Sequence, residues 1–193
     1  MRSLILLAAA VVFAPLCSAT PIGHKNFDPK CGEGMHPGFE TNIFQYDVPA
    51  QNFFDKTGSF FHSEWYTGPL LESTGEDDTV GATRSGNFSG TLFRERLVGY
   101  SSSSDELMHR YTLDNGPILF GDVLFGSYTE EMVILSICEG TATWISFTDV
   151  YCADKAAAAY NMYDRARRVL MDKLADDLGA MLFAGSCPGG HME

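Results

Sequence analysis

The stretch "VGATRSGNFSGTLFRERLVGY", residues 80–100, decides the fold class. It contains two strand-like runs, at about 79–86 and 91–100, which are separated by the turn residues of "SGNFSG". Glycine, asparagine and serine between two alternating runs are typical of an antiparallel hairpin. The fold is therefore expected to be built around this hairpin, with one of its faces buried.

The second strand of this hairpin carries a carboxylate on its apolar side. Alternate side chains of a strand share a face, so Glu95 lies with Phe93 and Leu97. Arg94 and Arg96 point the other way. A buried carboxylate has to be hydrogen-bonded, charge-paired or protonated. Glu95 is therefore the first candidate functional residue.

Further strand-like runs lie on both sides of the hairpin, each bounded by turn residues. They are expected at 41–48, 68–74, 106–114, 118–138 and 141–151. The run 118–138 is compatible with one long bulged strand or with two strands. Pro49 suits the first turn of a helix, and we expect one or two short helices between residues 49 and 66, broken near Gly58.

The hydrophobic period changes from two to 3.6 residues between Ala153 and about Phe183. This change predicts a long amphipathic helix that is ended by Gly185 and Pro188. Its apolar stripe contains Tyr160, Tyr163, Ala166, Leu170, Leu174, Leu178 and Met181. An antiparallel sheet that buries one face against a single long helix is an α+β fold.

The N-terminal residues 1–19 have the pattern of a secretory signal peptide. Arg2 precedes the apolar run "LILLAAAVVFAPL", and Cys17-Ser18-Ala19 forms a small-residue cleavage site. The apolar run is too short to span a bilayer. We therefore expect a soluble, secreted protein without a transmembrane segment. Its mature chain is expected to consist of an irregular arm, one domain and a tail, at residues 20–40, 41–184 and 185–193.

Several function classes are disfavoured by the sequence. The formal net charge of −12 argues against nucleic-acid binding, because no basic patch is available to neutralise phosphates. A Gly-rich phosphate loop before a helix and a G-x-S-x-G nucleophile elbow are both absent from the sequence. Asn87 begins an Asn-Phe-Ser sequon in the predicted turn and is a candidate glycosylation site. Nothing in the sequence indicates an oligomeric state.

Four cysteines follow the signal peptide: Cys31, Cys138, Cys152 and Cys187. They lack the CxxC spacing of a zinc site, and in an exported protein they are expected to form two disulfides. His62, Glu64 and His109 also lack the local spacing of a metal site. We therefore expect neither a metal nor another cofactor.

Two motifs and the order of the elements carry a resemblance to a known family. "VGATR", a short turn and "FRERL" are similar to a G-x-x-R…E-R-L spacing, and "ATWISF" is similar to a penultimate strand that bears a tryptophan. Both features are common in the helix-grip (START-like, SRPBCC) superfamily, which the sequence resembles over roughly 41–183. This superfamily includes the birch pollen allergen, plant abscisic-acid receptors and polyketide cyclases. The secretory arm and the four cysteines depart from most of its intracellular members.

The resemblance implies an architecture. In this family a curved, seven-stranded antiparallel sheet grips the long C-terminal helix, two short helices follow the first strand, and a cavity separates the sheet from the long helix. The loops 85–90 and 114–122 would occupy the places of the two loops that gate the pocket of the hormone receptors.

The family topology also implies a disulfide pairing. A hairpin of 127–138 and 141–151 would hold Cys138 and Cys152 about 35 Å apart. The long helix would hold Cys152 and Cys187 roughly 45 Å apart, which is again beyond bridging reach. In the family the helix returns along the sheet and the first strand pairs with the last. This arrangement leaves the pairs Cys31–Cys152 and Cys138–Cys187.

Strand register predicts two polar partners for Glu95. If the hairpin of 91–100 and 106–114 is centred near residue 103, Glu95 faces Tyr111 and Leu97 faces His109. A carboxyl group, a phenol and an imidazole in an apolar cavity can relay protons, as an isomerase or a cyclase requires. Glu95 could equally anchor a ligand through water or satisfy a core tyrosine.

The candidate ligand-binding residues are mainly aromatic and apolar side chains of the predicted interior elements. They are Phe93, Leu97, Leu113, Phe125, Trp144, Phe147, Tyr160 and Tyr163, with His62 at a polar entrance to the pocket. The alternative for His62 is a solvated position at a helix end. The sequence leaves open whether Trp144 or its neighbours Ile145 and Phe147 face inward.

The predicted function is the binding of a small hydrophobic metabolite, such as a polyketide, a terpenoid or a lipid-like molecule, in an internal cavity of a secreted protein. An alternative is a cofactor-independent cyclase, isomerase or dehydratase of natural-product biosynthesis, with Glu95 as general acid or base and Tyr111 or His109 assisting. A further alternative is a secreted interaction protein whose pocket is filled by side chains.

Overall fold

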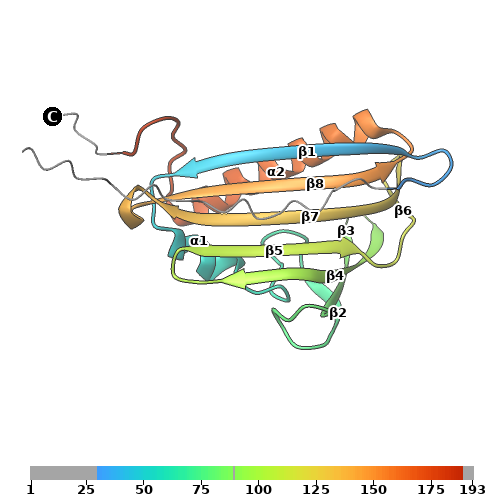
Figure 1. The fold of residues 1–193 in the computed structure, drawn as a ribbon, viewed down its shortest axis with the longest axis horizontal. Helices are drawn as coiled ribbons and strands as arrows, with labels where there is room; N and C mark the ends of the chain where they lie inside the picture. Colours follow the sequence, from blue (N-terminus) through green and yellow to red (C-terminus); the bar gives the residue numbers. More distant parts are fainter. Residues whose placement is uncertain (1–29, 89, 189–193) are drawn as a thin grey trace, which may run out of the picture.

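The computed structural model describes residues 30–88 and 90–188, so the signal peptide predicted at 1–19 lies outside the described residues. One antiparallel sheet packs against a long C-terminal helix (Figure 1). The elements in chain order are β1 (His36–Tyr46), α1 (Ala50–Thr57), β2 (Leu70–Thr74), β3 (Thr83–Phe88), β4 (Thr91–Ser102), β5 (Glu106–Leu113), β6 (Ile118–Phe120), β7 (Val123–Ile137), a 3-10 turn (Cys138–Gly140), β8 (Ala142–Ala153) and α2 (Ala156–Leu178).

The curved sheet confirms the predicted α+β class. Its strands follow the order β1-β8-β7-β5-β4-β3-β2, and β6 pairs with β7 beside this path. The sheet therefore has an eighth, three-residue strand in addition to the seven expected. The run 118–138 forms two strands because Gly121 adopts a φ of 59° between them, which permits a two-residue turn.

Two boundaries differ from the sequence-based prediction. β1 begins at His36, within the arm that was expected to be irregular up to residue 40, because its first residues pair with the last residues of β8. The long helix ends at Leu178 rather than near 183, because Gly179 takes a left-handed conformation and its amide caps the helix. The chain then returns beside β1, where the amide of Phe183 donates to Gln45.

The short helix α1 is followed by turns, and the second short helix that was expected between 58 and 66 does not form. An acidic loop holds the backbone of this segment instead. The amide of Phe60 donates to Asp78 Oδ1 at 2.9 Å, and that of Phe61 donates to Asp77 Oδ1 at 3.0 Å. These amides are therefore bound by side chains rather than by helical carbonyls.

The buried face of α2 differs from the predicted stripe. The helix buries Ala159, Tyr163, Arg167, Met171, Leu174 and Ala175. Tyr160, which was expected to face inward, is 45% exposed, and Met181 lies beyond the helix and is 69% exposed. The buried face is rotated relative to the predicted stripe. Its centre is a charged residue, Arg167, whereas the sequence pattern would place an apolar residue there.

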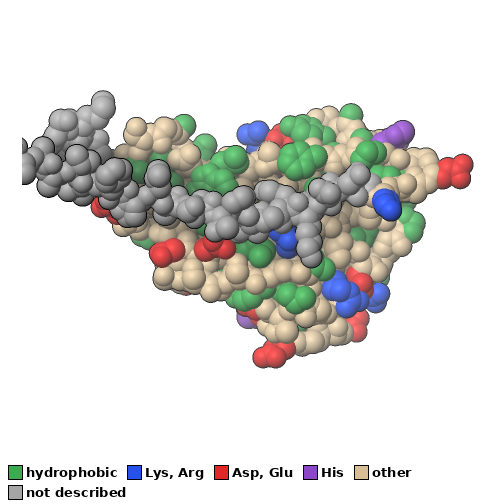
Figure 2. Space-filling view, in the orientation of Figure 1, with side chains coloured by type: hydrophobic (Ala, Val, Ile, Leu, Met, Phe, Trp, Pro, Cys, Tyr) green, Lys and Arg blue, Asp and Glu red, His purple; other side chains and the backbone are tan. Residues whose placement is uncertain are grey.

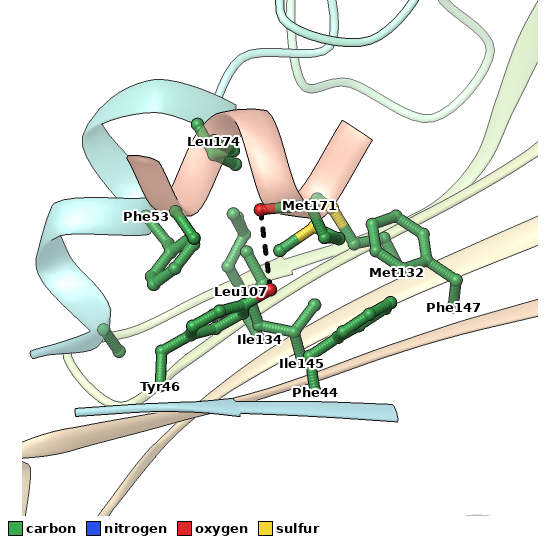
Figure 3. Close-up of a cluster of buried hydrophobic side chains, with 12 residues drawn as sticks. Phe44, Tyr46, Phe53, Leu107, Met132, Ile134, Ile145, Phe147, Met171 and Leu174 are labelled. Atoms are coloured by element: carbon green, nitrogen blue, oxygen red, sulfur yellow. Dashed lines mark hydrogen bonds between the residues drawn. The ribbon is translucent and has the colours of Figure 1, made fainter. Parts of the chain in front are cut away.

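One apolar cluster joins both helices to the sheet. Its twelve buried members come from α1, α2 and the strands β1, β5, β7 and β8. Figure 3 shows Phe53 of α1 and Leu174 of α2 above the strand side chains of this cluster, with the Tyr46 hydroxyl donating to the carbonyl of Met171 at 3.5 Å. A second cluster, rich in aromatic rings and including Phe125 and Tyr163, lies near the first turns of α2.

The structure contains the two disulfides that the family topology implies. Cys31 is bonded to Cys152 and Cys138 to Cys187, with Cα–Cα distances of 5.4 Å and 5.6 Å. The first attaches the chain before β1 to β8, and the second attaches the C-terminal tail to the turn between β7 and β8.

The outer face of the sheet carries side chains of several kinds. Figure 2 shows apolar side chains interspersed with charged ones on the face that is viewed in Figure 1. Among the described residues, no helix is long and apolar enough to cross a membrane.

Candidate functional site

A cavity of about 900 Å³ lies between α2, the turn at 64–67 and the strands β3, β4, β6 and β7. This volume lies within the range that is typical of small-molecule sites. The cavity is lined by Glu64, Trp65, Tyr66, Thr67, Phe88, Phe93, Glu95, Phe120, Gly121, Tyr128, Glu130, Ala158, Asn161, Met162, Tyr163, Arg165, Ala166, Arg167, Val169, Leu170 and Lys173.

A glycine shapes one aromatic part of this lining. Gly86 of β3 pairs directly with Phe93 of β4. A Cβ on Gly86 would lie 2.7 Å from the Phe93 ring, so the absence of a side chain allows the ring to lie across β3. The "SGNFSG" motif therefore supplies both the turn and the space for a ring in the cavity lining.

Glu95 points into the protein from β4 and is 2% exposed. Its Oε2 accepts a hydrogen bond from Arg84 Nε at 2.8 Å, and its Oε1 accepts one from the Tyr128 hydroxyl at 2.9 Å. Burial raises the pKa of the Glu95 carboxyl, and the Arg84 guanidinium acts against that rise. Arg84 keeps its proton, and both oxygens of Glu95 accept hydrogen bonds from the protein.

Arg84 is itself held firmly. Its guanidinium lies over the rings of Phe60 and Tyr111, with centroid distances of 4.3 Å and 4.6 Å. Its Nη1 also donates to the carbonyl of Phe60 at 2.9 Å. The cation–π contacts and the hydrogen bonds compensate for the burial of this charge.

Glu130 of β7 is the centre of a second network. Its Oε2 accepts hydrogen bonds from the hydroxyl of Tyr66 at 2.9 Å and from that of Tyr111 at 2.7 Å. The same oxygen also accepts a hydrogen bond from Arg167 Nη2 of α2. Side chains from the turn, β5 and α2 thus converge on one carboxylate oxygen at the cavity.

Arg167 links the long helix to this network. It is 1% exposed, and besides Glu130 it contacts Asp149 Oδ1 at 3.2 Å. Its guanidinium lies over the rings of Tyr66 and Phe147, at 4.5 Å and 4.6 Å from their centroids. A charge in this position fixes α2 relative to the sheet.

Sheet register places four polar side chains at one level. Glu40 pairs with Asp149, Asp149 with Glu130, and Glu130 with Tyr111. Directly paired residues point to the same face, so three carboxyl groups are neighbours below α2. This row had no counterpart in the sequence-based prediction.

The buried charges of the site are not balanced. Among the residues that the structure describes, the carboxyl groups of Glu40, Glu95, Glu130 and Asp149 are buried with two guanidinium groups, those of Arg84 and Arg167. Burial raises the pKa of Asp149 well above its usual value, against the lowering effect of Arg167, and the neighbouring carboxylates raise it further. Burial also raises the pKa of Glu40, which pairs with Asp149 across β1 and β8. Burial thus acts in the same direction on both carboxyl groups of this row and favours their protonated forms.

The structure does not bring Glu95, Tyr111 and His109 together. The expected register of the hairpin is wrong: Glu95 pairs with Leu113, and Leu97 pairs with Tyr111. A bulge between Leu97 and Gly99 shifts the pairing within β4, and the turn lies further along the chain than residue 103. As a result, Tyr111 donates to Glu130 rather than to Glu95.

His109 lies apart from the cavity. It is 3% exposed and stacks on the ring of Tyr100 at 5.2 Å. Burial and the nearby Arg84 lower its pKa to about 4, against the opposing effect of Asp77. The imidazole is therefore neutral near pH 7, and its Nε2 contact with Asp78 Oδ1, at 3.6 Å, is not an ion pair.

Of the candidate ligand-binding residues, Phe93 and Tyr163 line the cavity. Four others pack in the buried clusters or against them: Leu97, Leu113, Phe125 and Phe147. Ile145 and Phe147 face the core, so Trp144 points to the other side of β8. Tyr160 and His62 are exposed, and neither contributes to the lining. These differences follow from strand parity and from the rotation of α2.

Four residues at the centre of the site escaped the sequence analysis: Tyr66, Tyr128, Glu130 and Arg167. Tyr128, Glu130 and Met132 alternate in β7, and this alternation would have revealed an inward face if the strand boundaries had been known. Arg167 follows Tyr163 by one helical turn, but buried arginines are rare, so its position alone gave no signal.

No protein-family model and no curated protein matches the chain. Solved structures share its fold. XoxI from Bacillus cereus is 12% identical, with a TM-score of 0.56, over 73% of this chain and 95% of its own. A Nitrosospira multiformis protein is 20% identical, with a TM-score of 0.54, over 72% of this chain and 95% of its own.

A third structure with this fold is DynU16, which is described as a putative protein in the dynemicin biosynthetic locus. It is 14% identical and has a TM-score of 0.51, over 73% of this chain and 47% of its own. At these identities the three likenesses show the fold alone.

Proposed function

We propose that the chain is a secreted member of the helix-grip superfamily that binds a small apolar metabolite in the cavity beneath α2. The observation that carries this proposal is the cavity itself, which has a volume of about 900 Å³ and combines aromatic and aliphatic walls with a few fixed polar groups. Such a composition is typical of sites that bury most of a small ligand and orient it by one or two polar contacts. Space that side chains leave open favours binding over the alternative of a filled interaction protein.

Two features support export. The disulfides Cys31–Cys152 and Cys138–Cys187 are suited to an oxidising compartment. The side chain of Asn87 is exposed at the end of β3, where a glycan would extend into solvent. Both features agree with the signal peptide that the sequence predicts.

The alternative function is a cofactor-free cyclase, isomerase or dehydratase that uses Glu95 as general acid or base. It is favoured by the burial of Glu95 in the cavity lining, which raises its pKa toward the range of an acid–base catalyst. The likeness to DynU16 agrees with this alternative, because that protein is described as lying in a biosynthetic locus. Against it, Arg84 and Tyr128 already occupy both carboxylate oxygens.

Substitution of Glu95 separates the two functions. If the protein is a binder, Glu95→Gln retains much of the affinity for the ligand. If Glu95 is an acid–base catalyst, the same change lowers the rate by about 10²–10⁴-fold.

The proposed function is tested by native mass spectrometry of the protein secreted by its own host, followed by extraction and identification of any bound molecule. We expect one apolar metabolite per protein chain. A mass without ligand, unchanged after incubation with the metabolite extract of the host, would count against a binding protein.

A further inference from the structure

We infer that Glu130, through its Oε1, is the acceptor that holds the ligand, and that the ligand is a neutral apolar molecule with a hydroxyl group. This inference rests on the proposed function and names the chemistry of its ligand. It also moves the polar anchor from Glu95, the residue that the sequence singled out, to a carboxylate on β7.

The carboxylates of Glu130 and Glu95 differ in how many of their oxygens accept hydrogen bonds from the protein. Tyr66, Tyr111 and Arg167 all donate to Oε2 of Glu130, and within residues 30–88 and 90–188 no donor reaches its Oε1. Glu130 belongs to the cavity lining. Glu95 lines the same cavity, but each of its oxygens accepts a hydrogen bond from the protein.

A carboxylate offers about four acceptor positions. Three protein donors share Oε2, so Oε1 is left as the acceptor that is open to the cavity, and a donor that enters the cavity can pair with it. A hydroxyl group on the ligand supplies such a donor, whereas a ketone or an ether does not. The free oxygen therefore selects for a donor on an otherwise apolar molecule.

Glu130 is held in place before any ligand binds. β7 is paired on both sides at this residue, with Tyr111 of β5 and with Asp149 of β8. The guanidinium of Arg167 and the hydroxyl of Tyr66 restrain the carboxylate from above. A rigid acceptor loses little conformational entropy on binding, which increases its contribution to affinity.

The charges of the lining favour a neutral donor over an ammonium group. The lining contains three acidic side chains, Glu64, Glu95 and Glu130, and three basic ones, Arg165, Arg167 and Lys173. The residues that line the cavity, unlike the wider set of buried groups around it, thus carry no formal excess of negative charge that would repay the desolvation of a cation. A phenol, an enol or an aliphatic alcohol meets the requirement of Glu130 without this cost.

The test uses three aromatic probes with the same ring system: 1-hydroxypyrene, 1-methoxypyrene and 1-pyrenemethylamine. Their dissociation constants are measured by fluorescence titration at neutral pH. For the wild-type chain we expect 1-hydroxypyrene to bind at least about 10-fold more tightly than 1-methoxypyrene, because one hydrogen bond to a charged group is gained. We expect Glu130→Gln to remove this preference and Glu131→Gln to retain it.

Glu131→Gln is a matched control because Glu131 is adjacent in sequence, points to the other face of β7 and contacts Arg110 there. The inference is overturned if the wild-type chain binds both neutral probes equally well, a result that needs no variant to fold. It is also overturned if Glu95→Gln removes the preference while Glu130→Gln keeps it, or if 1-pyrenemethylamine binds most tightly. Failure of all three probes to bind counts against the proposed cavity function itself, so the two failures are distinguishable.

Discussion

Arg167 of α2 and Glu130 of β7 form a buried ion pair that attaches the C-terminal helix to the sheet beside the cavity. Both side chains are almost completely buried, and Arg167 also contacts the carboxyl group of Asp149. Removing one partner of a buried pair leaves the other charge without compensation, which is more costly than the pair itself is favourable. The position of α2, and with it the cavity, therefore depends on this contact.

The ion pair predicts a large difference between two neighbouring arginines. Arg167→Met should lower the free energy of unfolding by about 3–5 kcal/mol, because it leaves the carboxylates beneath α2 unpaired. Arg168 pairs with Asp164 on the exposed side of the same helix, and Arg168→Met should leave the stability unchanged within error. Urea unfolding of both variants measures the difference, and equal effects would contradict the role given to Arg167.

His109 predicts a loss of stability in acid. Its pKa is lowered to about 4 in the folded protein, while in the unfolded chain it has its ordinary value of 6.5. The unfolded chain therefore binds the proton first, and the stability contributed by neutral His109 is lost as the pH falls from about 6.5 to 4. The loss amounts to roughly 3.5 kcal/mol, at about 1.4 kcal/mol for each unit by which the pKa of His109 is lowered.

His109→Phe removes this titration. Chemical unfolding at several pH values should show that the stability of wild type relative to the variant falls between pH 6.5 and 4. The difference isolates His109 because all other groups titrate in both proteins. A constant difference over this range would mean that His109 is not buried as a neutral imidazole.

Asp149 predicts the opposite pH dependence. Its pKa is raised by burial, so the folded state holds the proton more tightly than the unfolded chain. The resulting stability is fully present below a pH of about 3.9 and is lost as the pH rises through the folded pKa. Asp149→Asn imitates the protonated form, so its stability relative to wild type should increase with pH. A relative stability that decreases with pH would show that Asp149 is ionised in the folded protein.

The disulfide Cys138–Cys187 predicts a stabilisation of the C-terminal tail. It closes a loop of 49 residues between the β7–β8 turn and the chain after α2. Loss of such a constraint typically costs about 2–5 kcal/mol. Cys187→Ala should therefore lower the unfolding midpoint and should increase amide exchange around Leu182, which bridges to Tyr46. Unchanged exchange at Leu182 would show that the bridge to β1 holds without the disulfide.

The α+β class of the fold could be predicted from the sequence. Turn residues such as those of "SGNFSG" marked the hairpin of β3 and β4, and the change of period near Ala153 marked α2. These signals are local, and the protein obeys them because its sheet has one buried face and mostly short connections. The disulfide pairing followed from the lengths of the elements together with the family topology.

The site was harder to predict because it depends on non-local register. The turn between β4 and β5 is centred beyond residue 103, so Glu95 pairs with Leu113 rather than with Tyr111, and no local signal marks the bulge between Leu97 and Gly99. Glu130 and Arg167 compensate each other only when β7 and α2 are packed together. Each would be judged a surface residue from its own sequence neighbourhood.

The most direct test of the account compares two tryptophan substitutions on α2. Ala166 lines the cavity, whereas Ala157 is exposed and does not contribute to the lining. Both variants and the wild type are titrated with 1-hydroxypyrene after circular dichroism has verified their folds. The account predicts that Ala166→Trp abolishes binding by filling the cavity and that Ala157→Trp binds as the wild type does. Equal binding by a folded Ala166→Trp variant would contradict the claim that the cavity beneath α2 is the ligand site.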